Sequence, residues 1–132
     1  MIGLDTNVLV RILAADDPVQ TPQATRFLKD RCSPEDPGFV NRVVITELLW
    51  VLQNAYRYGR ADIASALERL LANTSLTIES REQVERAVQT YEASNCDLVD
   101  ALIGEVNLAS GCIQTATFDR KASKLKGFVR VS

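Results

Sequence analysis

Short apolar runs alternate with helical spacings along this chain. The run from Ile2 to Leu4 has the length of a buried strand, and the apolar residues that follow recur every three or four positions, as in a helix: Val8, Leu9, Ile12 and Leu13. We therefore predict a strand followed by a helix, with Thr6 or Asn7 as the helix cap. Asp5 lies at the junction between the two.

The same alternation predicts four more strands and five more helices. The expected strands are Phe39–Val40, Leu76–Ile78, Cys112–Ala116 and Phe128–Val131. The first three expected helices run from Thr21-Pro22 to about Arg31, from Asn41 to about Tyr58, and from Gly59 to near Asn73. A fourth helix is expected to begin with a capping box formed by Ser80 and Gln83, and a fifth to run from an Asp97 cap to Gly111. A short helical turn is expected over residues 120–125.

Strands that alternate with helices predict an α/β fold. Parallel strands need a crossover, which is usually a helix, so we expect a three-layer α/β/α sandwich around a mostly parallel sheet of about five strands. The strands' carboxyl ends then share one edge of the sheet, where open α/β folds bind ligands. Asp5 follows one such strand, and Asp119 follows the Cys112–Phe118 run.

Length and composition indicate one domain over residues 1–132. Apolar residues make up 46% of the chain, and no apolar run reaches the roughly 20 residues that span a membrane. The N-terminus has no basic, apolar export signal, so we expect a cytoplasmic location. The three cysteines are widely spaced and are expected to be reduced structural thiols.

The chain contains no histidine, which excludes histidine-based triads and histidine-ligated metals. Acid–base or metal chemistry must then use carboxylates, lysines, tyrosines or cysteines, and carboxylates favour hard cations such as Mg²⁺ or Mn²⁺. Glu47 is expected to lie in apolar surroundings within a helix buried between its neighbours, where an unpaired carboxylate is costly to ionise. Asp97 and Asp100 occupy the cap and the third position of their helix, with Asp100 turned toward the sheet edge.

The topology brings one acid from each of four segments to one edge of the sheet: Asp5, Glu47, Asp100 and Asp119. Clustered carboxylates repel by roughly 4 kcal/mol per pair at about 4 Å, so such a cluster normally implies a cation. A divalent ion held in this way suits metal-assisted hydrolysis of a phosphodiester. Each acid also has a simpler explanation, since Asp5, Asp97 and Asp100 can stabilise helix N-termini, Asp119 can be a turn residue, and Glu47 can bond to the backbone.

Positive charge is concentrated at the C-terminus. The whole chain has a formal net charge of -2, but residues 119–132 carry +4, through Arg120, Lys121, Lys124, Lys126 and Arg130 against Asp119. Such a patch is compatible with a polyanion lying beside an acidic pocket, and equally with a solvated surface. Arg120, Lys121, Lys124 and Lys126 are the residues that we expect to contact this polyanion.

These motifs resemble the PIN-domain family over essentially the whole chain. The segments Leu4-Asp5-Thr6-Asn7, Thr46-Glu47-Leu48-Leu49-Trp50, Asp97-Leu98-Val99-Asp100 and Thr115-Ala116-Thr117-Phe118-Asp119 resemble the family's motifs in order. The resemblance implies that Asp5, Glu47, Asp100 and Asp119 hold the metal, supported by Thr6, Asp97 and Thr117. Two departures are Asn95-Cys96, where small residues are common, and Gly104, where alanine is common.

Chains of this length resemble the VapC-type toxins among PIN proteins. That resemblance implies a Mg²⁺- or Mn²⁺-dependent endoribonuclease that leaves a 5′-phosphate and a 3′-hydroxyl, forms a homodimer, and is inhibited by a cognate VapB-like antitoxin. The helix around Leu49, Trp50 and Leu52, with residues 60–73, is the expected groove for that partner, although core packing explains much of this apolar surface equally well. For a ribonuclease, the polyanion expected at Arg120, Lys121, Lys124 and Lys126 is RNA.

Two other functions remain open. A catalytically silent PIN-fold module would bind RNA or protein without cutting it. A receiver-like phosphoacceptor would need an aspartate after a middle strand, and Leu76-Thr77-Ile78-Glu79 offers none.

Overall fold

Strand pairing is parallel throughout, as the alternation of strands and helices predicts. The computed structural model describes residues 1–132, and the chain divides into two units, Met1–Glu79 and Ser80–Ser132. Six α-helices and five strands confirm the α/β class, with three strands in one sheet and two in another.

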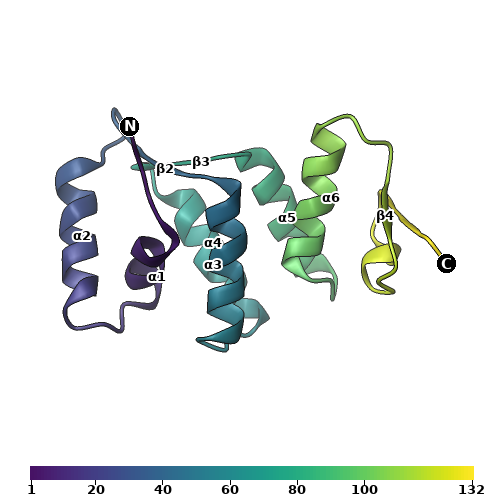
Figure 1. Cartoon of the computed structure of the whole chain (residues 1–132), viewed down its shortest axis with the longest axis horizontal. Helices are drawn as coiled ribbons and strands as arrows, with labels where there is room; N and C mark the ends of the chain where they lie inside the picture. Colours follow the sequence, from purple (N-terminus) through teal and green to yellow (C-terminus); the bar gives the residue numbers. More distant parts are fainter. The chain divides into compact units, whose positions relative to one another are not determined.

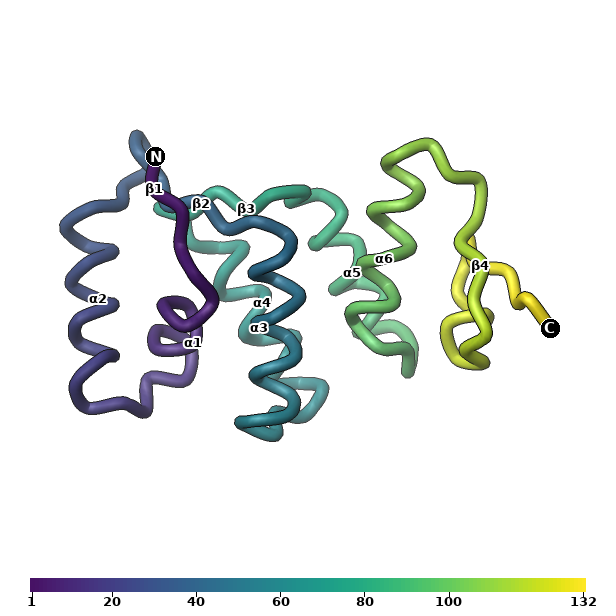
Figure 2. The backbone as a smooth tube through the Cα atoms, viewed as in Figure 1, coloured from purple at the N-terminus to yellow at the C-terminus, as the bar shows by residue number.

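The first unit contains the three-stranded sheet, in the order β1 (Ile2–Gly3), β2 (Gly38–Val40) and β3 (Leu76–Ile78). The strands lie side by side in Figure 2, with Gly3 opposite Phe39 and Phe39 opposite Thr77. Two connections lead from β1 to β2 and from β2 to β3, and each contains two helices. The carboxyl end of β1 therefore leads directly through Leu4 and Asp5 into a helix.

Four helices surround the core of the first unit: α1 (Thr6–Ala14), α2 (Gln20–Arg31), α3 (Arg42–Asn54) and α4 (Arg60–Ala72). Helix α1 lies between α2 and α3 (Figure 1). In this unit most of the largest fully buried side chains come from α1, α3 and α4, and they include Leu9, Leu48, Leu52, Ile63 and Leu67. The predicted apolar faces of α1 and α4 are therefore the core-facing ones.

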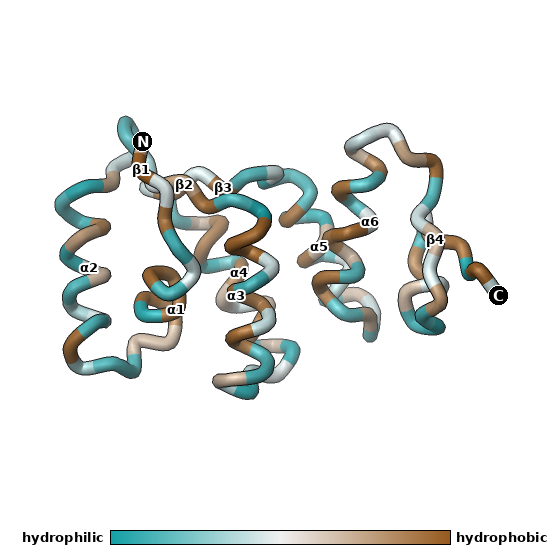
Figure 3. The backbone as a smooth tube through the Cα atoms, viewed as in Figure 1, coloured by the Kyte–Doolittle hydropathy of each residue, from teal (hydrophilic) through white to brown (hydrophobic).

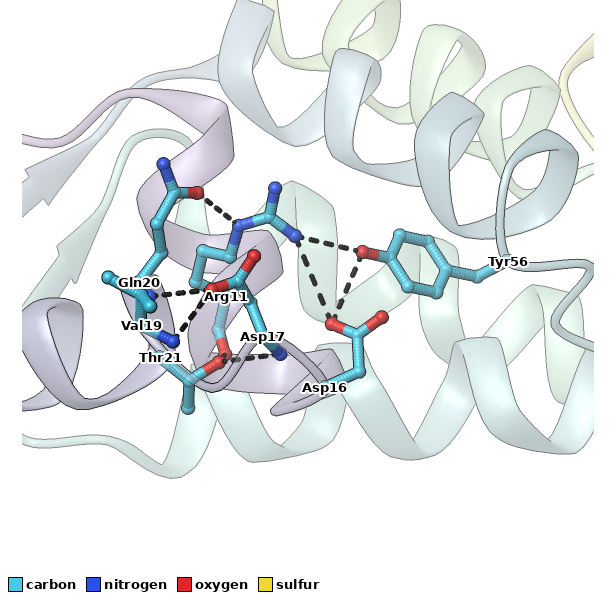
Figure 4. Close-up of polar contacts among 7 residues, drawn as sticks. All are labelled: Arg11, Asp16, Asp17, Val19, Gln20, Thr21 and Tyr56. Atoms are coloured by element: carbon cyan, nitrogen blue, oxygen red, sulfur yellow. Dashed lines mark hydrogen bonds and ion pairs between the residues drawn. The ribbon is translucent and has the colours of Figure 1, made fainter.

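Helix α2 has no buried residue and is mostly hydrophilic (Figure 3). Polar contacts hold its N-terminal end to α1. Thr21 Oγ1 donates to the carbonyl oxygen of Arg11 at 3.0 Å, and Arg11 Nε donates to Gln20 Oε1 at 2.6 Å (Figure 4). Arg11 Nη1 also donates to the Tyr56 hydroxyl at 3.2 Å, which connects the end of α1 to the residues after α3.

The second unit contains α5 (Arg81–Ala93), α6 (Leu98–Ala109), the paired strands β4 (Thr115–Thr117) and β5 (Phe128–Arg130), and a 3₁₀ turn, η1 (Ala122–Lys124). Helices α5 and α6 pack against each other. Buried side chains of the pair include Val84, Val88 and Tyr91 of α5 and Leu98, Ala101 and Leu102 of α6.

Several predicted boundaries and caps were wrong. Asp5, not Thr6 or Asn7, caps α1, and α2 begins at Gln20, where Asp17 Oδ1 accepts the backbone N–H groups of Val19 and Gln20. The Ser80/Gln83 capping box does not form, because Ser80 adopts a left-handed conformation with φ 57°. The caps predicted at Asn41 and Asp97 are confirmed, since each side chain accepts a backbone N–H of its helix.

The ends of two other elements also differ from prediction. Helix α3 ends at Asn54 instead of near Tyr58, and a positive φ of 55° at Arg57 marks the bend before α4. Strand β4 begins at Thr115 instead of Cys112, because pairing with β5 begins opposite Phe128. Cys32 and Cys96 are buried thiols, as expected of structural cysteines, whereas Cys112 is exposed. None of the helices combines the length and the apolar character that crossing a membrane requires.

Candidate metal-binding acids and nucleic-acid contacts

Asp5 follows β1 and caps α1. Leu4 continues the sheet, since its N–H donates to the Phe39 carbonyl oxygen at 2.9 Å, and the chain then turns into the helix. The Asp5 side chain is exposed, and its Oδ1 accepts the Thr6 N–H at 2.7 Å. Helix capping therefore uses one of its oxygen atoms.

Thr6 has an unusual environment for a hydroxyl group. The residue is only 5% exposed, and its Oγ1 atom is buried without a hydrogen-bond partner in the protein. An unsatisfied buried hydroxyl is costly, by roughly 1–3 kcal/mol. A polar atom kept in such a position next to Asp5 suits a supporting role toward a bound ligand, which is the role predicted for Thr6.

Glu47 lies in the second turn of α3 on an exposed face, so the prediction that it is buried among apolar residues was wrong. It lines a shallow depression with Val43, Thr46 and Trp50. Val43 is 76% exposed and Trp50 is 63% exposed, because the core packs against the opposite face of α3. The carboxylate of Glu47 is therefore accessible to solvent and is not enclosed by the core.

Asp97, Asp100 and Asp119 interact electrostatically in the second unit. Burial of Asp100 raises its pKa, and the negative charges of Asp97 and then Asp119 raise this pKa further. Asp97 is exposed and caps α6, with Oδ1 2.7 Å from the Val99 nitrogen. Asp97 is therefore the helix cap, as predicted, whereas Asp100 is half-buried in the first turn of α6.

Thr117 and Asp119 build the turn after β4. Thr117 Oγ1 accepts the Asp119 N–H at 3.0 Å, and Asp119 Oδ1 accepts the Ala122 N–H at 2.8 Å. These bonds fix the carboxylate at the start of η1, and they explain why a Thr-Phe-Asp sequence follows a strand here. Thr117 therefore orients the backbone that carries Asp119.

The predicted ligands are divided between the units, with Asp5 and Glu47 in the first and Asp100 and Asp119 in the second. Within neither unit do three carboxylate or cysteine side chains form a group that holds a metal ion. Their chemistry nevertheless fits a hard divalent cation. The donors are carboxylates. The pKa of Asp100 is raised by burial and then by the negative charges of Asp97 and Asp119, and a cation would relieve that repulsion.

The predicted RNA-binding residues are clustered around η1. Arg120, Lys121, Lys124 and Lys126 are all exposed, and η1 contacts both β4 and β5. The charge cluster is thus carried by a structured segment that begins next to Asp119.

Gly104 is a position whose importance the sequence indicated without explaining. A Cβ atom at Gly104 would lie 2.5 Å from Cε1 of Phe128, so the glycine admits an aromatic ring against α6. The signal in the sequence was a glycine inside a helix, which usually costs about 1 kcal/mol and so calls for a packing reason. The same ring forms part of a groove that sequence reasoning missed.

The sequence is similar to known proteins over nearly its whole length. Residues 2–127 match the sequence model of the PIN domain. A VapC ribonuclease from Aquifex aeolicus (strain VF5) is 27% identical to this chain over 130 residues, which cover 98% of this chain and 94% of that protein.

Proposed function

The chain belongs to the PIN-domain family, and on that premise we propose that it is a VapC-type toxin, a Mg²⁺- or Mn²⁺-dependent endoribonuclease. The observation that carries the proposal is the match to a VapC ribonuclease over nearly the full length of both chains. It covers every segment that contains a proposed acid.

We propose Asp5, Glu47, Asp100 and Asp119 as the ligands of the divalent ion. When bound, such an ion supplies charge neutralisation at a phosphate and lowers the pKa of water. Like-charge repulsion from Asp97 and Asp119 supports this assignment, because it makes the environment of Asp100 favourable for a cation. The partnerless Thr6 hydroxyl next to Asp5 supports it as well, since it offers one more hydrogen bond.

The residues around η1 have a separate role in this proposal. Arg120, Lys121, Lys124 and Lys126 bind the phosphates on either side of the cleaved bond. The segment that carries them begins directly after Asp119, whose turn is fixed by hydrogen bonds with Thr117 and with the Ala122 N–H. The protein therefore combines an acidic site that holds a cation with a basic surface that holds RNA.

The test is cleavage of a purified tRNA pool by the intact protein, with Mg²⁺, with Mn²⁺ and with EDTA. We expect cleavage only with a divalent ion, with products that carry a 5′-phosphate and a 3′-hydroxyl. Asp5→Asn and Asp100→Asn keep the side-chain shape but remove charge, so each should reduce both cleavage and Mn²⁺ affinity. Asp30→Asn, an exposed acid of α2, is the matched control.

RNA binding without cleavage under every metal condition would contradict the nuclease assignment and favour a silent binding module. Mn²⁺ affinity that is unchanged in both Asp5→Asn and Asp100→Asn would instead exclude the proposed acids.

We also propose regulation by a small VapB-like antitoxin, expected from the family, whose arginine pairs with the acidic site in place of the metal ion. A planar guanidinium can bind two carboxylate oxygens at once. The predicted anchoring groove needs correction, because Leu49 and Leu52 are 1% and 0% exposed and cannot contact a partner. Val43 and Trp50 are the apolar residues that α3 leaves exposed.

The test of this regulation is to co-purify the product of the adjacent gene and to titrate it against cleavage at several Mg²⁺ concentrations. Inhibition should weaken as Mg²⁺ increases and should disappear when the partner's arginine is replaced. Inhibition that is independent of both would contradict metal-site occlusion. The expected homodimer is tested on the same sample by light scattering after gel filtration.

A further inference from the structure

A groove in the second unit lies along α6, beyond its acidic first turn. Its volume is about 440 Å³, which is within the range of small-molecule binding sites. Apolar walls come from Gly104 and Leu108 of α6 and from Leu125 and Phe128 of the C-terminal segment. Ile113 stands at its edge and is 90% exposed.

The absence of a side chain at Gly104 shapes this groove. Phe128 approaches the helix so closely that a Cβ atom at position 104 would overlap its ring. The ring is only half-buried, so part of it remains accessible beside Leu108 and Leu125. An aromatic group in such a wall suits a flat, weakly polar ligand.

Two charged residues also line the groove. Glu105 supplies a carboxylate that accepts hydrogen bonds, and Lys126 supplies a cation. Lys126 also belongs to the C-terminal segment that carries a net charge of +4 over residues 119–132. The groove therefore combines an apolar wall, an acceptor and a positive charge, which matches a nucleotide's base face, amino group and phosphate.

The groove is also close to the acidic turn of α6. Gly104 follows Asp100 by one helical turn, a rise of about 6 Å at 1.5 Å per residue. A nucleotide held in this groove would therefore be one or two nucleotides along the RNA strand from a phosphate bound near Asp100. We infer that this groove binds one unpaired base of the RNA substrate, with Lys126 on a phosphate and Glu105 accepting a base amino group; the inference rests on the proposed function.

The first experiment measures binding of fluorescent tetracytidylate and tetrauridylate to the intact protein in EDTA, by anisotropy. Cytosine carries an amino group at the position where uracil carries an oxygen, so we expect tetracytidylate to bind several-fold tighter. Glu105→Gln should remove most of this preference, because an amide can also donate to the uracil oxygen.

The second experiment separates the groove from general electrostatics. Ile113→Asp and Val131→Asp each add one negative charge to an exposed residue of the same unit, but only Ile113 lines the groove. Ile113→Asp should weaken binding by about tenfold, as expected when a base loses its apolar contact, and the loss should persist at high salt. Val131→Asp should have a smaller effect that disappears at high salt.

Equal effects of the two aspartates, or no preference between the two RNAs, would overturn the inference while leaving the ribonuclease proposal intact. A wild-type protein that binds no RNA would contradict both. If Ile113→Asp releases a co-purified protein and leaves RNA affinity unchanged, the groove belongs to a protein partner and the inference is wrong.

Discussion

The ring of Phe128 occupies the space that a side chain on residue 104 would need. The ideal Cβ position at Gly104 lies 2.5 Å from Cε1 and 2.9 Å from Cζ of that ring. The Phe128 ring therefore lies so close to α6 that any side chain at position 104 would force the ring to shift. This contact explains why the helix keeps a residue that lowers its intrinsic stability.

Replacing Gly104 by alanine should destabilise the protein, even though alanine favours helix by about 1 kcal/mol. The displaced ring must shift in a packed environment, and overpacking costs roughly 1–3 kcal/mol. Urea unfolding measures the net effect. Phe128→Leu in the same chain should remove the clash, so the double variant should be more stable than the two single changes predict. A Gly104→Ala protein that is more stable than wild type would contradict this account.

Asp100→Asn should stabilise the metal-free protein at neutral pH. Burial, Asp97 and Asp119 raise the pKa of Asp100, so folding favours its protonated form. That contribution to stability is fully present below the pKa of an unfolded aspartate, about 3.9, and it is lost as pH rises through the higher folded pKa. Thermal unfolding in EDTA should therefore show a gain at pH 7 that shrinks toward pH 3.

Mg²⁺ provides the matching control for Asp100. The wild-type melting temperature should rise with millimolar Mg²⁺, because the ion binds the folded state, while Asp100→Asn should respond less. If Asp100→Asn destabilises the protein equally at both pH values, Asp100 has a structural role that its charge does not explain.

Asp17 should show the opposite pH dependence. Hydrogen bonds from the backbone N–H groups of Gln20 and then Val19 lower its pKa. Desolvation opposes this lowering, and the charge of Arg11 adds a smaller lowering. The stabilisation that ionised Asp17 adds to the free energy of unfolding is present above the unfolded pKa of about 3.9. It is lost as pH falls through the lower folded pKa. Asp17→Ala should speed amide exchange in α2 at pH 7, because α2 has no buried residue to hold it. Unchanged exchange rates in α2 would contradict the capping role.

Neutralising Lys121 and Lys124 should reduce the salt dependence of RNA binding. Each lost phosphate contact lowers the slope of log affinity against log salt by about 0.7 for single-stranded RNA. Anisotropy titrations at several salt concentrations measure it, and Arg26 with Lys29, two exposed cations of α2, provide a control with the same charge change. Equal slopes for the two double variants would exclude this surface from RNA binding.

The sequence by itself determined most of the elements and the chemical character of the site. Hydrophobic spacing placed β3 correctly at Leu76–Ile78 and identified the buried face of α4, because burial of one face imposes a period on the sequence. The motifs that contain Asp5, Glu47, Asp100 and Asp119 occur in the order that is typical of the PIN-domain family, and this order indicated the family. The absence of histidine excluded histidine ligands, and carboxylates were the remaining side chains that suit a hard cation.

Only the tertiary structure decided which face of α3 is buried. The apolar sequence of α3 predicted burial all round, yet Val43 and Trp50 are exposed, since neighbouring elements cover only one side. The structure likewise decided which side chains accept the first backbone N–H groups of α1 and α2, namely those of Asp5 and Asp17. The Gly104–Phe128 contact joins residues 24 positions apart, and the raised pKa of Asp100 depends partly on Asp119, in another element. Such effects depend on distances in space, which spacing along the chain does not specify.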